Sequence, residues 1–387
     1  MDLSYTLEQD AFRAEIRSWL AANKPANPLV TLECREGYDQ HVAWERQLAS
    51  GNWGMVTWPE AYGGRGLDLI QWLIFEEEYW GSGAPLRANQ NGIFLLGPTI
   101  MEYGTEEQKA RFLTPMAAGE VIWAQAWSEP GAGSDMAAIK TTAYRDGDHY
   151  VINGQKTWSS RASFADWGFG LFRTEEGSQR HKGLSFVLFD LDTPGITRRP
   201  IRQLHGHPGF AELFFDDVRV PVENRLAGEG EGWKVAMATA GFERGLMLRS
   251  PGRFQATARR LVELFRKHEA DAAPSAREAV AKAWMDTQAY AYNTYAVAAK
   301  IMAGGSIGAE ASLNKIFWSE LDRAMNRTAM QLLGAAAELR RFDDGSMNDW
   351  LEGYIFSLSG PIYAGSNEIQ RNITAERLLG MPRVGAG

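Results

Sequence analysis

The chain has 387 residues, of which 45% are hydrophobic and 23% are charged, and its formal net charge is −8 at pH 7. This composition excludes a chain that is disordered throughout, because the apolar residues suffice for two or three buried cores. The acidic balance also argues against nucleic acid or an anionic membrane as the main binding partner.

The N-terminal third of the sequence is predicted to be mostly helical. Thr6 and Gln9 have the spacing of a capping box ahead of apolar residues at helical intervals, and Thr105 and Gln108 repeat this arrangement. We therefore expect a helical domain over residues 1–120. The first segment is acidic where a signal peptide would be basic and then apolar, and the sequence holds no apolar run long enough to cross a bilayer. A cytoplasmic protein without membrane association is expected.

The middle of the chain changes to short β-rich runs. Between residues 121 and 222 the sequence contains HYVINGQKTW, FGLFRT, GLSFVLFDL and AELFFDDVRV, which are rich in aromatic and β-branched residues. Asn153 and Gly154 have the composition of a two-residue hairpin turn. These features predict an antiparallel β domain over residues 121–228.

The C-terminal third returns to long amphipathic segments after the glycine-rich run AGEGEGW. Helices are predicted over residues 232–268, 275–303, 309–335 and 367–380, and breaks are predicted at HEADAAPS, AGGSIG and the DDGS turn. Segments of this kind pack into helix bundles, so a bundle domain is expected over residues 229–387.

Several common sites are excluded by the sequence. It contains no G-x-G-x-x-G run after a strand, no G-x-x-x-x-G-K-[ST] and no H-E-x-x-H, so a Rossmann site, a P-loop and a zincin are unsupported. Cys34 is the only cysteine, which rules out an intrachain disulfide and suits a reducing compartment. His205 and His207 have alternate spacing but no third ligand nearby, which favours a turn or strand-edge role over a metal site. No metal is expected.

Two runs in the β region can support ligand chemistry. They are SEPGAGSDM at residues 128–136 and NGQKTWSS at residues 153–160. Small residues after Pro130 let backbone N–H groups approach a polar or anionic ligand closely, and several serines add hydroxyl groups. Either run alone could be an ordinary turn.

Together, and in this order, the two runs resemble those of the acyl-CoA dehydrogenase family. The resemblance extends over nearly the whole chain, and its further matches are VTWPEAYGGRGL at 56–67, YGTEEQKARFL at 103–113, FFDDVRVP at 214–221, EGWKVA at 231–236 and GSNEIQRNITAERLLG at 365–380. It implies an α+β fold with an N-terminal helical domain, a middle antiparallel β-barrel domain and a C-terminal four-helix bundle.

The same resemblance implies FAD as the cofactor. It places the Ser160 hydroxyl against flavin N5. It also implies that a Q-x-x-G-G-like run, which ends here in Gly334 and Ala335, contacts the FAD of a neighbouring subunit. The C-terminal motif is implied to bind the phosphates on the adenosine side of FAD. The residues implied to bind FAD are Gln125, Trp127, Ser128, Gly133, Ser134, Trp158, Ser160, Gln331, Gly334, Ser366, Asn367 and Glu368.

The reaction of the family is α,β-dehydrogenation of an acyl-CoA thioester, which requires a base for the α-proton. The common Y-E-G-T motif supplies that base from its glutamate, but this chain has Ala364 in its place. Another branch, of the isovaleryl- and long-chain type, carries the base on a bundle helix in an L-E-R-like run, which FER at 242–244 resembles. Glu243 is therefore the expected base, on a helix face shared with Ala236, Thr239 and Met247, whose apolar character would strengthen it toward a carbon acid. Substrate-binding residues implied by the resemblance are Ser134, Arg244, Ala364 and Gly365.

The resemblance also implies partners and leaves alternatives. Electrons are expected to pass to an electron-transfer flavoprotein, and a homo- or hetero-oligomer, a dimer of dimers, is expected. Three departures favour a non-catalytic partner subunit of a heteromeric dehydrogenase, namely Ala364, Ala335 and the lack of a clear R-x-x-F-G run in HEADAAPSAREAVAKAW, where only Arg277 is a candidate substitute. A flavin oxidase or monooxygenase on the same fold is the other alternative.

Overall fold

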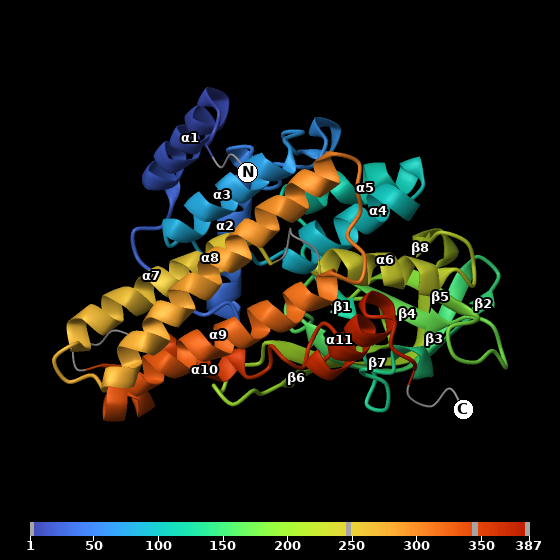
Figure 1. Ribbon diagram of the computed structural model, residues 1–387. Coiled ribbons are helices and arrows are strands. Elements are labelled where there is room, and N and C mark those ends of the chain that lie inside the picture. The colour runs from blue at the N-terminus through green and yellow to red at the C-terminus, as the bar shows by residue number, and fades with distance from the viewer. Residues whose placement is uncertain (1–3, 245–248, 343–346, 384–387) are drawn as a thin grey trace. The chain divides into compact units, whose positions relative to one another are not determined.

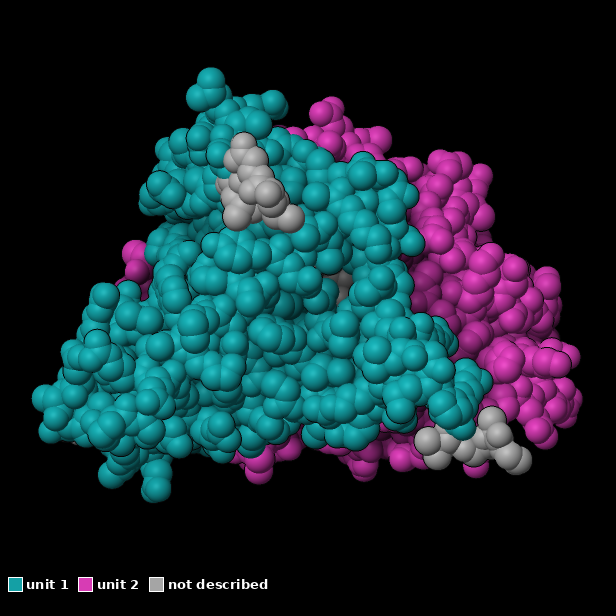
Figure 2. All heavy atoms as spheres, viewed as in Figure 1, with its two compact units in different colours: residues 1–24, 68–84, 244–387 teal, residues 25–67, 85–243 magenta. Residues whose placement is uncertain are grey.

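The computed structural model describes residues 4–244, 249–342 and 347–383, and for Glu243 and Arg244 it describes the backbone alone. Its elements run in the order helices, strands, helices (Figure 1). The chain forms two compact units, each with its own colour in Figure 2. Unit 1 comprises residues 1–24, 68–84 and 244–387, and unit 2 comprises residues 25–67 and 85–243. The boundaries that the sequence suggests at residues 120 and 228 stay predictions.

Unit 1 is built from helices. Three long helices, α7, α8 and α9, pack against one another around a core that contains Phe254, Leu261, Tyr290, Trp318 and Met325 (Figure 1). The helices of this unit are α1 (Leu7–Asn23), α3 (Leu69–Gly81), α7 (Pro251–His268), α8 (Pro274–Met302), α9 (Ala311–Leu333), α10 (Asp349–Ser357) and α11 (Asn367–Ile373), with the short turns η5 (Gly334–Glu338) and η6 (Thr374–Leu378).

Unit 2 contains the sheet and the remaining helices. The helical elements are α2 (Arg35–Ser50), η1 (Glu60–Tyr62), η2 (Asn91–Leu96), α4 (Gly97–Tyr103), α5 (Glu106–Ala117), η3 (Met136–Ala138), η4 (Val222–Asn224) and α6 (Gly232–Arg244). The strands are β1 (Trp123–Ala126), β2 (Thr142–Asp146), β3 (His149–Ser160), β4 (Trp167–Arg173), β5 (Leu184–Asp190), β6 (Ile196–Ile201), β7 (Phe210–Pro221) and β8 (Arg225–Leu226).

The strands form one 8-stranded sheet in the order β6-β7-β3-β2-β4-β5-β8, with β1 paired to β4. Most neighbours are antiparallel, as the sequence predicts, but β4 pairs in parallel with β1 and with β2. The sheet buries an aromatic and aliphatic core that includes Tyr150, Ile152, Phe172, Phe189 and Phe215. The predicted sequence of a helical, a β and a second helical region is confirmed. None of the described helices combines the length and apolar character needed to cross a membrane.

Both predicted capping boxes are present. The Thr6 hydroxyl accepts from Gln9 N at 3.2 Å while the Gln9 side chain accepts from Thr6 N at 3.0 Å, and Thr105 and Gln108 make the same pair of bonds. These exchanges satisfy N–H groups that the first helical turn leaves without partners.

The hairpin predicted at Asn153 and Gly154 is wrong. Both residues lie inside β3, and the β2–β3 turn falls instead beside Gly147, which has a φ of 62°. Gly154 has a φ of 140°, and a Cβ there would lie 2.7 Å from the Thr141 hydroxyl. Glycine is needed at this irregularity because a side chain would clash, so the Asn-Gly pair marks a bulge and not a turn.

One of the predicted C-terminal helices needs correction. The segment 232–268 contains two helices, because α7 starts anew at Pro251 after Ser250, and residues 245–248 lie outside the described part of the chain. The helix predicted over residues 367–380 is present, as α11 and the π-helical turn η6 that continues it directly to Leu378. Helix α10 and the strands β1, β2, β6 and β8 lie outside the predicted helices and strands. In β6 the run ITRRPI is mostly half-buried or exposed and contains Pro200, so it lacks the apolar alternation of a typical strand.

Candidate active site

Most of the first candidate run lies in a loop, residues 127–134, directly after β1, which we call the glycine loop. Glu129 and Ala132 exchange backbone hydrogen bonds of 3.0 Å each, which closes a tight turn. A Cβ added at Gly131 or Gly133 would meet no atom of the described residues within 4 Å, so this side of the loop is open to a ligand. At the start of the loop the Trp127 ring is buried against Phe169 and Phe186. Its Nε1 is buried without a hydrogen-bond partner among the described residues.

The second candidate run ends in a bulge of β3. The register between β3 and β7 shifts between Lys156 and Ser159, and Trp158 within that shift has a φ of 56°. A left-handed backbone is unfavourable for a bulky residue and is found where surrounding contacts impose it. The Trp158 side chain is 58% exposed, whereas Ser159 beside it is fully buried. The bulge therefore turns a large aromatic ring outward, which gives a flat ligand a surface to stack on.

The two runs lie side by side. Thr157 N donates to Ser128 O at 2.8 Å, and the Lys156 ammonium lies 2.9 Å from the Glu129 carboxylate. Burial alone would raise the pKa of Glu129, but the ammonium of Lys156 and hydrogen bonds from Thr141 and Lys140 hold it below its ordinary value. Sequence analysis missed this ion pair although both members stand inside the quoted runs.

This arrangement fits a flavin. The open glycine turns, the outward Trp158 ring and the buried Trp127 Nε1 provide backbone approach, an aromatic face and an unused donor for a polar aromatic ligand. Gln125 lies in β1, which leads into the loop, and the half-buried Ser160 is the last residue of β3. The Ser160 carbonyl accepts a hydrogen bond from the Asn91 side chain at 3.3 Å. Ser134 is exposed in the loop.

The remaining predicted cofactor residues belong to unit 1. Gln331 lies exposed in the last turn of α9, and Gly334 follows it with a φ of 56°. Ser366 caps α11 through Ile369 N at 3.4 Å. The Asn367 side chain is buried and bonds within the bundle, to Lys315 at 2.8 Å, Ser319 at 3.1 Å and Glu320 at 3.0 Å. Hydrogen bonds from its own backbone N–H and from Ser366 lower the pKa of the exposed Glu368 carboxyl.

The predicted thioester-binding residues form a strained turn in the same unit. Ala364 has a φ of 57° and Gly365 a φ of 80°, so two successive residues are left-handed. A Cβ at Gly365 would lie 2.4 Å from Gln370 Nε2, and that amide donates to Gly365 O at 3.3 Å. Successive backbone groups in such a turn point to one side, where N–H groups can bind a carbonyl oxygen.

Helix α6, which carries Glu243, is anchored to the sheet. Gly230 N donates to the Ser185 hydroxyl at 3.0 Å, and a Cβ at Gly232 would lie 2.5 Å from Ser185 backbone atoms. The predicted apolar face is buried, because Ala236 and Thr239 are fully covered and the Thr239 hydroxyl bonds the Thr99 hydroxyl at 2.8 Å. The side chains of Glu243 and Arg244, and Met247 altogether, lie outside the described residues.

The histidine pair belongs to the β6–β7 connection. His205 lies 3.0 Å from the Glu33 carboxylate, and His207 N donates to His205 Nδ1 at 3.3 Å. No group of three or more potential metal-ligating side chains occurs among the described residues.

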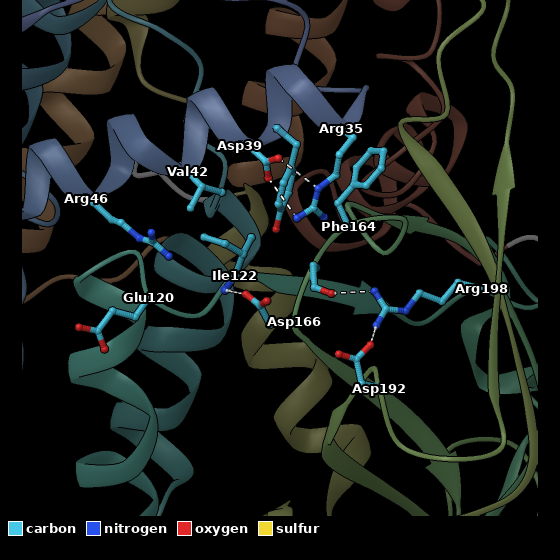
Figure 3. Close-up of a pocket in the computed structure, with 12 residues that line it drawn as sticks. Arg35, Asp39, Val42, Arg46, Glu120, Ile122, Phe164, Asp166, Asp192 and Arg198 are labelled. Atoms are coloured by element: carbon cyan, nitrogen blue, oxygen red, sulfur yellow. Dashed lines mark hydrogen bonds and ion pairs between the residues drawn. The ribbon is translucent and has the colours of Figure 1, made fainter.

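A separate cavity of about 470 Å³ opens in unit 2 (Figure 3). Its charges pair largely with one another, as Arg35 does with Asp39 and Arg198 with Asp192. No predicted cofactor or substrate residue lines it. The lining residues are Arg35, Tyr38, Asp39, Val42, Arg46, Glu120, Ile122, Phe164, Ala165, Asp166, Asp192 and Arg198.

Comparisons with known proteins identify the family. Sequence models of the acyl-CoA dehydrogenase N-terminal, middle and C-terminal domains match residues 6–120, 124–218 and 230–379. The chain is 42% identical to acyl-CoA dehydrogenase IpdE1 of Mycobacterium tuberculosis over 98% of its length and 99% of that protein, and 33% identical to FadE26 of the same organism over 99% of both.

Solved structures give the same result. The structure titled Tcur3481-Tcur3483 steroid ACAD superposes with a TM-score of 0.87 at 28% identity, covering 99% of this chain and 100% of that one. The ChsE4-ChsE5 complex from Mycobacterium tuberculosis superposes with a TM-score of 0.83 at 31% identity over 99% and 100%. With the glycine loop and the Trp158 bulge joined in one β region, and with family models matching from residue 6 to residue 379, this chain belongs to the acyl-CoA dehydrogenase family of FAD-dependent oxidoreductases.

Proposed function

We propose that this chain catalyses the α,β-dehydrogenation of a bulky, steroid-derived acyl-CoA thioester and that Glu243 removes the α-proton. The observation that carries the proposal is the bond from Thr157 N to Ser128 O, because it joins the open glycine loop to the strand that exposes the Trp158 ring. The steroid-derived acyl group is supported by the likeness over 99% of the chain to a structure whose title names a steroid enzyme.

FAD is assigned to residues 125–134, Trp158 and Ser160. Gln331 and Gly334 are assigned to the FAD of a neighbouring subunit, and residues 366–368 are assigned to the phosphates on the adenosine side of FAD. When bound, FAD supplies the hydride acceptor for the substrate β-carbon. Trp158 provides the stacking face, and the Ser160 hydroxyl is assigned as a hydrogen-bond donor to the flavin ring. Ser134, exposed on the open side of the loop, is assigned to the substrate.

Proton removal is assigned to the end of α6. Glu243 lies one helical turn beyond Thr239 in α6. Thr239 is fully buried, so the helix is held in place by packing on that face. The left-handed turn at Ala364 and Gly365 presents backbone N–H groups suited to a thioester oxygen, which would acidify the α-proton. Losing a carboxylate at 364 leaves that function of the backbone intact. Arg244 is assigned to ordering the substrate.

A second subunit is part of the proposal. The titles of two similar structures name two gene products each, ChsE4 with ChsE5 and Tcur3481 with Tcur3483. By analogy this chain would work in a homo- or heteromeric assembly, with an electron-transfer flavoprotein as acceptor. A non-catalytic partner role is the second candidate, and Ala364 favours it because the commoner branch has its base there.

The substrate class is tested by anaerobic flavin reduction with a panel of thioesters. A steroid-ring acyl-CoA, a branched short acyl-CoA and a linear palmitoyl-CoA are mixed with the oxidised protein. We expect the steroid thioester to reduce the flavin fastest. Faster reduction by the linear chain would refute the bulky substrate while leaving the dehydrogenase assignment in place.

Ser160→Ala is expected to slow flavin reduction by about 1–3 kcal/mol of activation free energy, because it removes a hydrogen bond that strengthens as the flavin gains electrons. Acyl-CoA binding should change little. Ser163→Ala is the matched control, since the Ser163 hydroxyl bonds the backbone of Pro208 and Phe210 nearby. Unchanged reduction in Ser160→Ala together with lost acyl-CoA binding would place the serine at the substrate instead.

A further inference from the structure

Lys156 is a fully buried cation at the base of the candidate flavin site. Its ammonium is 0% exposed and bonds Glu129 at 2.9 Å, Leu171 O at 2.8 Å and Trp127 O at 3.3 Å. It also lies 5.0 Å from the centre of the Phe172 ring. An ammonium has three donors, and all three are used, which is the condition for keeping such a charge out of water.

Glu129 closes the loop from the other side. Its carboxylate accepts from Lys140 N at 2.7 Å and from Thr141 N at 2.9 Å, in addition to Lys156. Residues 140 and 141 lie at the far end of the segment that Glu129 begins. One carboxylate therefore holds both ends of residues 129–141, while the exposed residues between them remain open to a ligand.

The bonds of Lys156 and Thr157 hold three consecutive residues of the glycine loop. Trp127 O and the Glu129 carboxylate bind the Lys156 ammonium, and Ser128 O binds Thr157 N. The register shift that exposes Trp158 begins at Lys156 itself. The ion pair thus adds a second link between the two halves of the site, beside the backbone bond from Thr157 N to Ser128 O.

We propose that the Lys156–Glu129 ion pair is a positioning element that holds the glycine loop and the Trp158 bulge as one preformed flavin-binding surface. The proposal rests on the proposed function, which assigns FAD to these residues. Stability alone does not account for the pair, because buried ion pairs can often be replaced by apolar residues without loss of stability. What an apolar replacement cannot supply is the set of directed bonds from the Lys156 ammonium to Trp127 O and to the Glu129 carboxylate, which hold residues 127 and 129 against β3.

The test compares Lys156→Met with a second buried pair in the same unit. Arg87 and Glu45 lie 2.7 Å apart with side chains 4% and 3% exposed, and neither belongs to the candidate site. For each variant the Kd of FAD for the apoprotein, the circular dichroism of the bound flavin and the Tm of the apoprotein are measured. Lys156→Met should raise the Kd about 10- to 100-fold, the loss seen when the partners that orient metal ligands are removed, and should change the flavin dichroism. Arg87→Met should lower the Tm while leaving the Kd and the dichroism near the parent values.

The double variant Lys156→Met/Glu129→Gln separates position from stability. It removes both charges, so the Tm should recover toward the parent value, but the weak FAD binding should persist because the directed bonds are still missing. If Lys156→Met fails to fold, the double variant carries the same test. Parent FAD affinity in either variant, or a Kd that follows Tm equally in Arg87→Met, would overturn the positioning role. A parent protein that binds FAD but dehydrogenates no acyl-CoA would instead count against the proposed function.

Discussion

Glu243→Gln is expected to retain FAD and bind acyl-CoA but to lose flavin reduction by about two to four orders of magnitude. The substitution keeps the size of the side chain and removes the only carboxylate assigned to the α-proton. Rapid anaerobic mixing with a good thioester substrate measures the loss, with FAD content and acyl-CoA affinity measured on the same sample. Reduction at the parent rate would show that the base lies elsewhere.

Ala364 offers the converse test. Adding Ala364→Glu to Glu243→Gln restores a carboxylate at the position that the commoner branch of the family uses. Some flavin reduction should return, with a preference for a different acyl chain. The loss in the single variant decides the role of Glu243, and the gain in the double variant would show that both positions reach the same α-proton.

Gly232→Ala is expected to destabilise the protein by about 1–3 kcal/mol or more and to slow catalysis as well. A Cβ at this position would lie 2.5 Å from Ser185 Cα and 2.6 Å from Phe186 N, so α6 or β5 must move. Alanine gains at most about 1 kcal/mol of helix propensity over glycine, which does not offset a backbone clash. Because α6 ends in the expected base, the displacement should also lower kcat. Denaturant unfolding and steady-state kinetics measure the two effects.

The same helix supplies the control. Among the described residues a Cβ at Gly241 would meet no atom within 4 Å, so Gly241→Ala should gain helix propensity without a clash and stabilise the protein by up to about 1 kcal/mol. Equal destabilisation by both variants would contradict the claim that close packing of α6 on β5 sets the effect. A normal kcat in a destabilised Gly232→Ala variant would show that the packing of α6 against β5 does not position the base.

Local signals in the sequence were sufficient where the chemistry is local. Thr6 with Gln9 and Thr105 with Gln108 start helices as predicted, because each capping box is completed within four residues. Asn153 and Gly154 failed for the opposite reason. Their turn preference is overridden by β3, which pairs with β2 on one side and with β7 on the other. The Ser250-Pro251 pair was a readable signal for a new helix that the apolar periodicity concealed.

The candidate site was also predicted only in part, since its local runs were found but its contacts between distant residues were not. The runs SEPGAGSDM and NGQKTWSS were singled out for their small residues and hydroxyl groups, but only the family resemblance, carried by both runs in this order, distinguished them from ordinary turns. The outward turn of Trp158 depends on a register shift against β7, which lies more than fifty residues away in sequence. The Lys156–Glu129 bond joins residues 27 apart, and nothing in either run shows that both side chains point inward. Partners distant in sequence are therefore what sequence reasoning missed.

The central claim, that this chain is itself a dehydrogenase of acyl-CoA thioesters, is tested most directly by one anaerobic turnover. The purified protein is mixed with a steroid-ring acyl-CoA without oxygen, and the flavin absorbance and the mass of the thioester are followed together. The account predicts that oxidised-flavin absorbance disappears while one thioester per flavin loses two hydrogens and becomes the 2-enoyl-CoA. A protein that holds no FAD even after reconstitution would contradict the account and favour a non-catalytic partner subunit. A product that gains oxygen only when air is admitted would also contradict it and favour an oxygen-using flavoenzyme.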